Sequence, residues 1–179
     1  MKRAAELRGL SDDHHQGLVQ ARRLRRPSLG EAGNPAEAAA AFLDFWRKDT
    51  SVHFRKEEEV LLPVFARHGG DPVREPLGEM LAQHTRIRSL VMELGDQVAD
   101  GEVRPETLQS IGELLETHIR LEERQVFPLI EETLTAEALK EVASRLTVAE
   151  AGPKAEPWVP ARGLSYDPWP GPGDSEGGG

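Results

Sequence analysis

The sequence predicts an all-α protein: an antiparallel up-down four-helix bundle with a short C-terminal helix and an extended Pro/Gly-rich tail. Ala, Leu, Glu and Arg dominate residues 1–149, and the alternation of β-branched and aromatic residues that marks strands is missing there. Apolar residues recur at helical spacing in four long segments. Four amphipathic helices with short links bury their apolar stripes most simply as an antiparallel bundle.

Capping residues, prolines and glycines place the ends of the expected helices. The expected helices cover residues 11–26, 35–68, 71–100 and 105–133, with a short fifth helix over residues 135–148. The first is expected to start at Ser11 as its N-cap, and the second at Asn34, which is followed by a proline at the first helical position. Glycines follow the second and third helices, as is typical of helix C-termini.

Composition excludes several classes of protein. The chain has 179 residues, a net charge of −9 and no cysteine. No apolar run approaches the roughly 20 residues that cross a bilayer, and the first ten residues lack the apolar core of a signal peptide. We therefore expect a soluble, cytoplasmic protein with no membrane partner and, given the negative charge, no nucleic-acid partner. Any metal must be held by His, Asp and Glu.

We expect residues 1–150 to form the single domain and residues 151–179 to form the tail. Residues 152–179 contain seven Gly and six Pro, too many for a helix or a strand ladder. They also contain Trp158, Tyr166 and Trp169. These aromatic residues indicate either docking, on this bundle or on a protein partner, or plain disorder.

A basic cluster lies near the end of the first expected helix. Residues 1–30 carry seven Lys or Arg against three Asp or Glu, and four of the arginines are Arg22, Arg23, Arg25 and Arg26. Such a cluster either touches an anionic partner or, more simply, forms the solvated face of a helix.

An internal repeat is the most informative feature of the sequence. Residues 53–63 (HFRKEEEVLLP) and residues 118–128 (HIRLEERQVFP) match at one His, one Arg, two Glu and one Pro. Four residues advance about 400° around a helix, so the histidine and the first glutamate of each block share one face. Each helix can therefore offer one imidazole and one carboxylate to a common point. The pairs are His53 with Glu57 and His118 with Glu122.

Both pairs interrupt an apolar helix face. Charged groups on a core-facing stripe cost free energy unless something neutralises them, so two intrusions at matching depth indicate a shared partner. The second glutamates, Glu58 and Glu123, lie about 100° further round and either face solvent or support the ligands from outside. The two faces are Phe42, Phe45 or Trp46, Asp49, His53, Glu57 and Leu61, and Ile111, Leu114 or Leu115, His118, Glu122 and Val126.

The other two long helices each supply one histidine to an apolar face. His84 is in phase with Leu77, Met80, Ile87, Val91 and Leu94. His14 is in phase with Leu10, Leu18 and Ala21 and is favoured over His15, although a phase error of one residue reverses that choice. His68 precedes two glycines and is expected to interact with the last carbonyls of its helix.

The resulting ligand set holds four imidazoles and two carboxylates: His14, His53, Glu57, His84, His118 and Glu122. Six such ligands fit a dinuclear centre in which the carboxylates bridge two ions. A single tetrahedral zinc site would leave two of the six unused. We therefore expect two non-haem iron ions, with manganese the second choice and zinc less suitable.

The chain resembles the hemerythrin-like (HHE cation-binding) domains over roughly residues 8–132. The resemblance rests on LSDDHH at residues 10–15, on the two repeated blocks and on His84 between them. It implies an up-down-up-down bundle around a di-iron centre that binds or reacts with dioxygen, and it assigns ligand roles to the same six residues. Oxygen carriers of this family have a second histidine on the third helix, where this chain has Arg88. Arginine cannot ligate a metal, so one coordination position is expected to be open or water-filled.

Three functions follow from this inventory. In the first, the di-iron site binds or senses dioxygen, nitric oxide or iron. In the second, it is an enzyme that reduces peroxide or reactive nitrogen species. The third is a metal-free helical interaction domain, against which the two inward carboxylates argue. The first is favoured because a small bundle leaves little room beside two metals for more than a diatomic molecule or peroxide.

Overall fold

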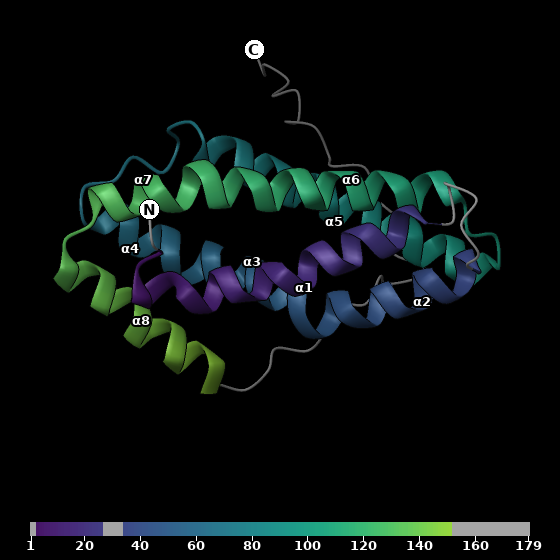
Figure 1. Ribbon diagram of the computed structural model, residues 1–179, viewed down its shortest axis with the longest axis horizontal. Helices are drawn as coiled ribbons and strands as arrows, with labels where there is room; N and C mark the ends of the chain where they lie inside the picture. Colours follow the sequence, from purple (N-terminus) through teal and green to yellow (C-terminus); the bar gives the residue numbers. More distant parts are fainter. Residues whose placement is uncertain (1–2, 27–33, 152–179) are drawn as a thin grey trace, which may run out of the picture.

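The computed structural model describes the backbone of residues 3–26 and 34–151, where all regular secondary structure is helical. Long helices lie side by side along the longest axis, and a shorter one, α8, packs at one end (Figure 1). The all-α class is confirmed. Residues 152–179 of the predicted tail, with its aromatic residues, lie outside the described part of the chain, and the first residue of that tail, Ala151, ends a helix. None of the helices in that part combines the length and the hydropathy of a membrane-spanning segment.

The first helix begins earlier than expected. It comprises η1 (Ala5–Leu7) and α1 (Arg8–Arg25). Leu7 and Leu10 are buried, and their burial extends the helix toward the N-terminus. The prediction that Ser11 caps the helix is wrong: its hydroxyl donates to Glu123 Oε1 at 2.5 Å.

The second helical run begins as predicted. Asn34 Oδ1 accepts a hydrogen bond from the amide of Ala36 at 3.0 Å, which makes Asn34 the N-cap of α2. The run consists of α2 (Pro35–Phe45), η3 (Trp46–Thr50), α3 (Ser51–Lys56), η4 (Glu57–Leu61) and α4 (Leu62–Arg67). The elements η3 and η4 are π-helical turns, in which each closing hydrogen bond spans five residues instead of four.

Prolines explain the π-turns that follow the two repeated His–Glu pairs. The amide of Leu62 donates to the carbonyl of Glu57, and the amide of Phe127 donates to that of Glu122, which closes η5 (Glu122–Val126). The next residue in each case is a proline, whose ring crowds the carbonyl four residues earlier and which has no amide to donate. The helix widens there as a result.

The π-turn η3 corrects one assignment on the apolar face. Asp49 was expected on the inward stripe, but it is exposed and Thr50 is buried in its place. A π-turn adds one residue to a helical turn, so it rotates the following side chains relative to an α-helical projection. No proline accounts for η3.

The later helices are α5 (Leu77–Asp100), α6 (Pro105–Leu121), α7 (Phe127–Thr133) and α8 (Ala136–Ala151). Helix α5 starts six residues later than expected, because Pro72 and Pro76 disfavour helical backbone in the residues before them. It ends at Gly101, whose φ of 79° lies in the left-handed region where glycine is preferred.

Close packing joins the first and last long helices. Helix α6 packs against α1 and α5, and α2 packs against α5 and α1. At the α1–α6 contact, a Cβ on Gly112 would lie 2.6 Å from the carbonyl oxygen of Ala21. Helix α8 packs against α4 and η1, so His68 Nε2 contacts Glu141 Oε2 at 2.9 Å instead of a helix-end carbonyl.

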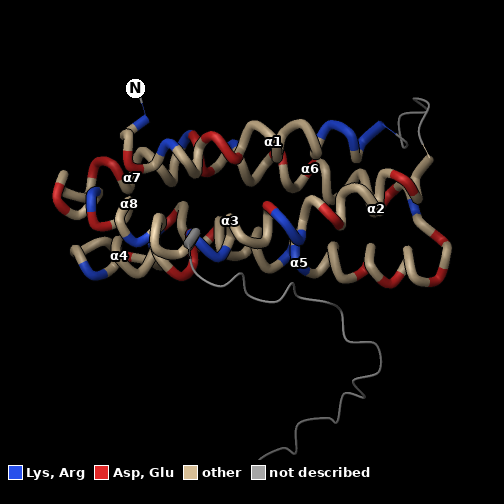
Figure 2. The backbone as a smooth tube through the Cα atoms, turned by 90° about the horizontal axis from the view of Figure 1, so that it is seen from below, with Lys and Arg blue, Asp and Glu red and all other residues tan. Residues whose placement is uncertain are grey.

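Lys, Arg, Asp and Glu recur along the length of the helices (Figure 2). Near the end of α1, Arg22, Arg23 and Arg26 are exposed, and Arg25 pairs with Glu116 on α6 at 2.6 Å.

A buried polar layer divides the apolar core into two clusters. One cluster contains Leu10, Leu61, Met80 and Val126, and α8 covers it with apolar residues of its own. The other contains Ala21, Phe54, Ile87 and Ile119 among its members. The six histidines and glutamates singled out from the sequence are buried at or next to the places where the long helical runs pass from one cluster to the other, and Gln83 is buried beside His84.

Candidate metal centre

The six residues selected from the sequence come together in the buried layer. Glu57, Glu122 and His84 are 0% exposed, and the remaining histidines are at most 6% exposed. Helix α1 presents His14 to the layer and leaves His15 exposed. The six residues are His14 from α1, His53 from α3, Glu57 from η4, His84 from α5, His118 from α6 and Glu122 from η5.

The imidazoles meet as two pairs. Nε2 of His14 lies 3.1 Å from Nε2 of His53, and Nε2 of His84 lies 3.2 Å from Nε2 of His118. Two imidazoles bound to one cation at about 2.1 Å and roughly at right angles have their nitrogens about 3 Å apart. Each pair therefore has the spacing of neighbouring ligands on one ion.

Each carboxylate spans both imidazole pairs. Glu57 Oε1 lies 3.2 Å from His53 Nε2, and its Oε2 lies 3.4 Å from His84 Nε2. Glu122 Oε2 lies 2.9 Å from His14 Nε2, and its Oε1 lies 3.0 Å from His118 Nε2. Two overlapping groups result, and both contain Glu57 and Glu122. We call the group with His14 and His53 the first half and the group with His84 and His118 the second half.

The buried carboxylates have the character of cation ligands. All four oxygens of Glu57 and Glu122 are buried, and none has a partner in hydrogen-bonding geometry, although imidazole nitrogens lie within ion-pair distance. Leaving carboxylate oxygens without hydrogen bonds in a protein interior is costly. Cations between the carboxylates and the imidazoles would satisfy these oxygens and the Nε2 atoms together, so the residues present fit two metal ions.

A second set of residues binds the outer nitrogen of every imidazole. Nδ1 of His14 lies 2.7 Å from Glu123 Oε1, and Nδ1 of His84 lies 2.7 Å from Glu58 Oε1. These contacts favour the alternative in which the second glutamate of each repeat supports the site from outside. With Nδ1 donating outward, Nε2 is the nitrogen that faces the centre, where it offers its lone pair once it has lost its proton.

Sequence reasoning missed the two remaining partners. Asp13 Oδ2 lies 3.2 Å from His53 Nδ1, and Gln83 Oε1 lies 3.2 Å from His118 Nδ1. Asp13 directly precedes His14 but contacts His53, the other histidine of the first half. Gln83 directly precedes His84 but contacts His118, the other histidine of the second half. In the sequence, the signal for such a partner is a polar residue next to a core-facing histidine. Only the helix packing shows which imidazole ring that residue contacts.

The electrostatics of the protein without metal are those of a buried network of imidazoles and carboxylates. Burial lowers the pKa of His14, but Glu122 and Glu123 more than offset this and raise it to about 9. Burial likewise opposes protonation of His53 and His84, yet carboxylates raise the pKa of each to about 10. Burial raises the pKa of Glu122, but the neighbouring imidazoles outweigh it and hold the pKa well below its usual range.

The supporting glutamates are also held ionised. Burial raises the pKa of Glu58, but the hydrogen bonds from His84 and Arg88 lower it to about 2. Burial has the same opposing effect on Glu123, whose pKa falls to about 2 through bonds from His14, Ser11 and Arg3. An ionised carboxylate is a strong acceptor for an imidazole N–H.

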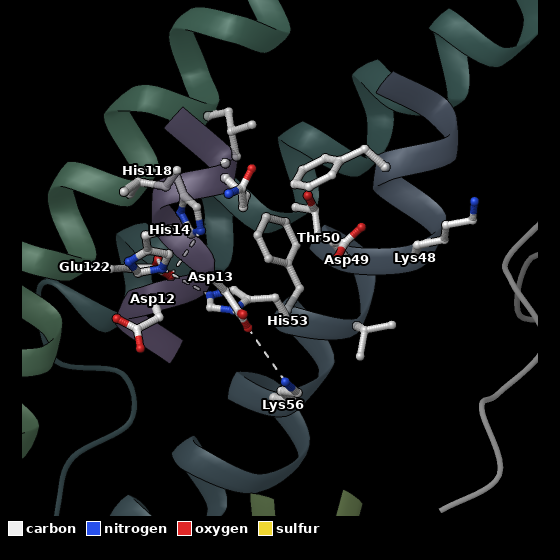
Figure 3. A pocket seen from close by; sticks show the side chains of 17 residues that line it. Asp12, Asp13, His14, Lys48, Asp49, Thr50, His53, Lys56, His118 and Glu122 are labelled. Carbon is white, nitrogen blue, oxygen red and sulfur yellow. Dashed lines mark hydrogen bonds and ion pairs between the residues drawn. The ribbon is translucent and has the colours of Figure 1, made fainter. Parts of the chain in front are cut away.

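A pocket of about 230 Å³ leads to the first half of the site. It lies between α1 and the segment from α2 to α3, and its inner wall includes His14, His53 and Glu122 (Figure 3). Asp13 and Lys56 line it and pair at 3.6 Å. Both histidines of the first half line the pocket, whereas of the second half His118 lines it and His84 does not, so the pocket reaches the two halves unequally.

Comparison with known proteins identifies the family. The model of the hemerythrin HHE cation-binding domain matches residues 7–130. No curated protein and no solved structure matched the chain. The matched segment covers more than half of the chain and contains all six converging residues. This chain is therefore a member of the hemerythrin HHE cation-binding domain family.

Proposed function

We propose that the protein holds two non-haem iron ions and uses them to bind or sense dioxygen, nitric oxide or iron. The observation that carries the proposal is the position of the two carboxylates. Each directs one oxygen to the first imidazole pair and the other oxygen to the second, which suits bridging ligands. The antiparallel four-helix arrangement expected from the sequence belongs to the same proposal and is supported by the contacts of α6 with α1 and α5.

The donor set argues against a single zinc ion. A tetrahedral zinc ion uses four ligands and would leave two of the six converging residues unused. Mixed imidazole and carboxylate ligands suit iron first and manganese next. When bound, two iron ions supply reversible redox chemistry and coordination of a small ligand.

The protein residues determine how a small ligand reaches this site. The pocket admits a molecule to the first half, and its inner wall is formed partly by His53 and Glu122. Asp13 accepts the Nδ1 proton of His53 and pairs with Lys56, so the ring of His53 is held in one tautomer. In the second half, the stacking of Phe54 on His84, with ring centroids 3.7 Å apart, covers the imidazole.

A second candidate is a di-iron enzyme that reduces peroxide or reactive nitrogen species. The polar pocket wall favours it, because Asp13 and Lys56 are proton-carrying groups that line the path to the site. Reduction of peroxide consumes two electrons and two protons, so an external electron donor is required and the pocket wall would conduct the protons.

Elemental analysis of protein purified without chelators tests the proposal. We expect about two iron atoms per chain and an ultraviolet absorption that changes on reduction and returns in air. An equilibrium response to dioxygen or nitric oxide supports binding, whereas sustained consumption of hydrogen peroxide with an added reductant supports the enzyme. One zinc ion, or no metal in protein that also fails to bind added Fe²⁺, would overturn both.

A further inference from the structure

An arginine lies behind the second half of the site. Arg88 on α5 forms a bidentate ion pair with Glu58: Nη1 lies 2.7 Å from Oε1, and Nη2 lies 2.9 Å from Oε2. The same Glu58 Oε1 accepts the Nδ1 proton of His84 at 2.7 Å. The guanidinium therefore fixes the carboxylate that orients the imidazole.

The same arginine also reaches His84 through an aromatic ring. Its guanidinium carbon lies 5.4 Å from the centre of the Phe54 ring. That ring stacks on the imidazole of His84 with centroids 3.7 Å apart and an interplanar angle of 16°. Arg88 thus acts on the imidazole of His84 in two ways. Through the carboxylate of Glu58 it sets where Nδ1 points, and through the ring of Phe54 it sets the tilt of the imidazole plane.

The first half contains the same arrangement, built from different parts of the fold. Arg3, which precedes η1, pairs with Glu123 at 2.8 Å, and Glu123 accepts the Nδ1 proton of His14 at 2.7 Å. The guanidinium carbon lies 4.9 Å from the centre of the Phe127 ring. Phe127 stacks on His14 with centroids 5.4 Å apart and an interplanar angle of 6°.

The two arrangements are not a simple consequence of the sequence repeat. Glu58 and Glu123 occupy matching positions in the two blocks, but Phe54 and Phe127 do not. The arginines come from the N-terminal segment and from the middle of α5. Helix packing thus brings the same four types of side chain together twice, once on each side of the bridging carboxylates.

We propose that Arg88 and Arg3 are positioning residues, each of which holds one metal-binding histidine of its own half and so sets the affinity of one of the two cations. The proposal rests on the dinuclear centre proposed above. Partly exposed ion pairs contribute little to folding, whereas loss of a residue that orients a metal ligand typically weakens metal binding 10- to 100-fold.

We expect each arginine variant to lose metal affinity at one half of the site only. Arg88→Gln should weaken the cation bound by His84 and His118, and Arg3→Gln should weaken the cation bound by His14 and His53. Each variant should lower one of the two affinities about 10- to 100-fold and leave the other within about threefold. A general loosening of the bundle would weaken both cations together.

Matched variants separate positioning from the loss of a positive charge. Arg86→Gln removes an exposed arginine two residues from Arg88 on the same helix, and Arg8→Gln removes an exposed arginine of α1. Arg3 also pairs with Glu131 at 3.0 Å, so Glu131→Gln loosens that second contact without touching Glu123. All three controls should retain both affinities. Arg88→Lys should restore part of the lost affinity, because lysine keeps the charge but loses the bidentate fork.

The test uses the full-length protein with two probes. Titration of the metal-free protein with Co²⁺, followed by visible absorption, gives the two affinities, and ⁵⁷Fe Mössbauer spectra distinguish the two iron environments. We expect Arg88→Gln and Arg3→Gln each to alter one of the two spectral components, and not the same one. Urea denaturation of each metal-free variant checks that the midpoint of unfolding is unchanged.

The outcomes separate this proposal from the one on which it rests. If the unsubstituted protein binds two cations and both arginine variants match their controls, or weaken both cations equally, the positioning role is overturned and the dinuclear centre stands. An unsubstituted protein that binds fewer than two cations overturns the dinuclear centre, and the positioning role with it.

Discussion

Glu57 and Glu122 are the residues through which the two halves of the site depend on each other. Each is fully buried, and each directs its two oxygens to different imidazole pairs. The histidines, in contrast, contribute to one pair each. A change at a glutamate is therefore expected to affect both cations, whereas a change at a histidine should affect one more than the other.

The first prediction concerns Glu57. Replacing it with alanine should remove both cations together, with each affinity falling by more than the 10- to 100-fold typical of a supporting residue. Glu59→Ala is the matched control, because Glu59 lies on the same π-turn and its side chain is 61% exposed. Elemental analysis of the two variants after iron loading measures the effect. Retention of one full equivalent by Glu57→Ala would show that its carboxylate does not bridge.

The second prediction concerns protons released on metal binding. The raised pKa values of His14, His53 and His84, about 9 to 10, keep these imidazoles protonated at pH 7 in the metal-free protein. A metal requires neutral imidazole, so binding at pH 7 should release about three protons. Calorimetric titration in buffers of different ionisation enthalpy counts them.

The sign of the pH dependence follows from the same shifts. Because the folded pKa values exceed the usual 6.5 for histidine, the stability that these histidines give the metal-free protein is complete below pH 6.5. It is lost as pH rises through about 9 to 10, while metal affinity increases over the same range. Metal affinity that is constant between pH 6.5 and 9 would contradict this account.

At the scale of elements, two features of the helices bear on the site: their π-turns and one close helix contact. The π-turns η4 and η5 begin at the glutamates of the two His–Glu pairs, and the prolines after them explain the widened turns. Helices α1 and α6, which carry His14 and His118, approach each other closely at Gly112.

The third prediction tests this helix contact. Gly112→Ala would place a Cβ 2.6 Å from the carbonyl oxygen of Ala21, so α1 and α6 must separate. We expect the free energy of unfolding to fall by about 1 to 3 kcal/mol, the usual cost of overpacking. Gly78→Ala is the control, since the nearest atom to its Cβ would be 3.6 Å away. Urea denaturation should show Gly78→Ala unchanged or slightly stabilised, and equal effects of the two substitutions would contradict the packing argument.

At the scale of the whole molecule, metal binding and folding should be linked. The buried layer between the two apolar clusters holds carboxylate oxygens without hydrogen-bond partners. A cation that binds only the folded chain raises its free energy of unfolding. The gain grows with the logarithm of the ratio between the free cation concentration and Kd. The protein therefore gains stability from the ions that its interior is suited to hold.

The fourth prediction measures that linkage. At a free metal concentration 100 times Kd, each cation should add about 2.7 kcal/mol to the free energy of unfolding. Thermal denaturation should show Tm rising with added Fe²⁺ under anaerobic conditions. Glu57→Ala should show no such rise, and a Tm independent of metal in the unsubstituted protein would contradict the linkage.

The fifth prediction concerns the tail. All six converging residues lie within residues 7–130, the segment that matches the family. Removing residues 152–179 should therefore leave the metal content and the affinities unchanged, which elemental analysis of the shortened chain can check. Loss of either cation would place part of the tail in the site.

Sequence alone determined the helical class, the cap at Asn34, the end of α5 at Gly101 and the six residues that meet in the core. These properties depend on local backbone preference and helical periodicity, which act over a few residues. The ligand roles of the six residues and the domain boundary stay predictions.

Only the tertiary structure decided which outer partner each imidazole receives. Asp13 and Gln83 contact histidines on other helices, and Arg3 lies next to Glu123, which is 120 residues away in sequence. The π-turn η3 also moved Thr50 inward in place of Asp49. Side chains on different helices meet according to helix rotation and separation, which the packing of the whole bundle sets and a projection of one helix does not contain.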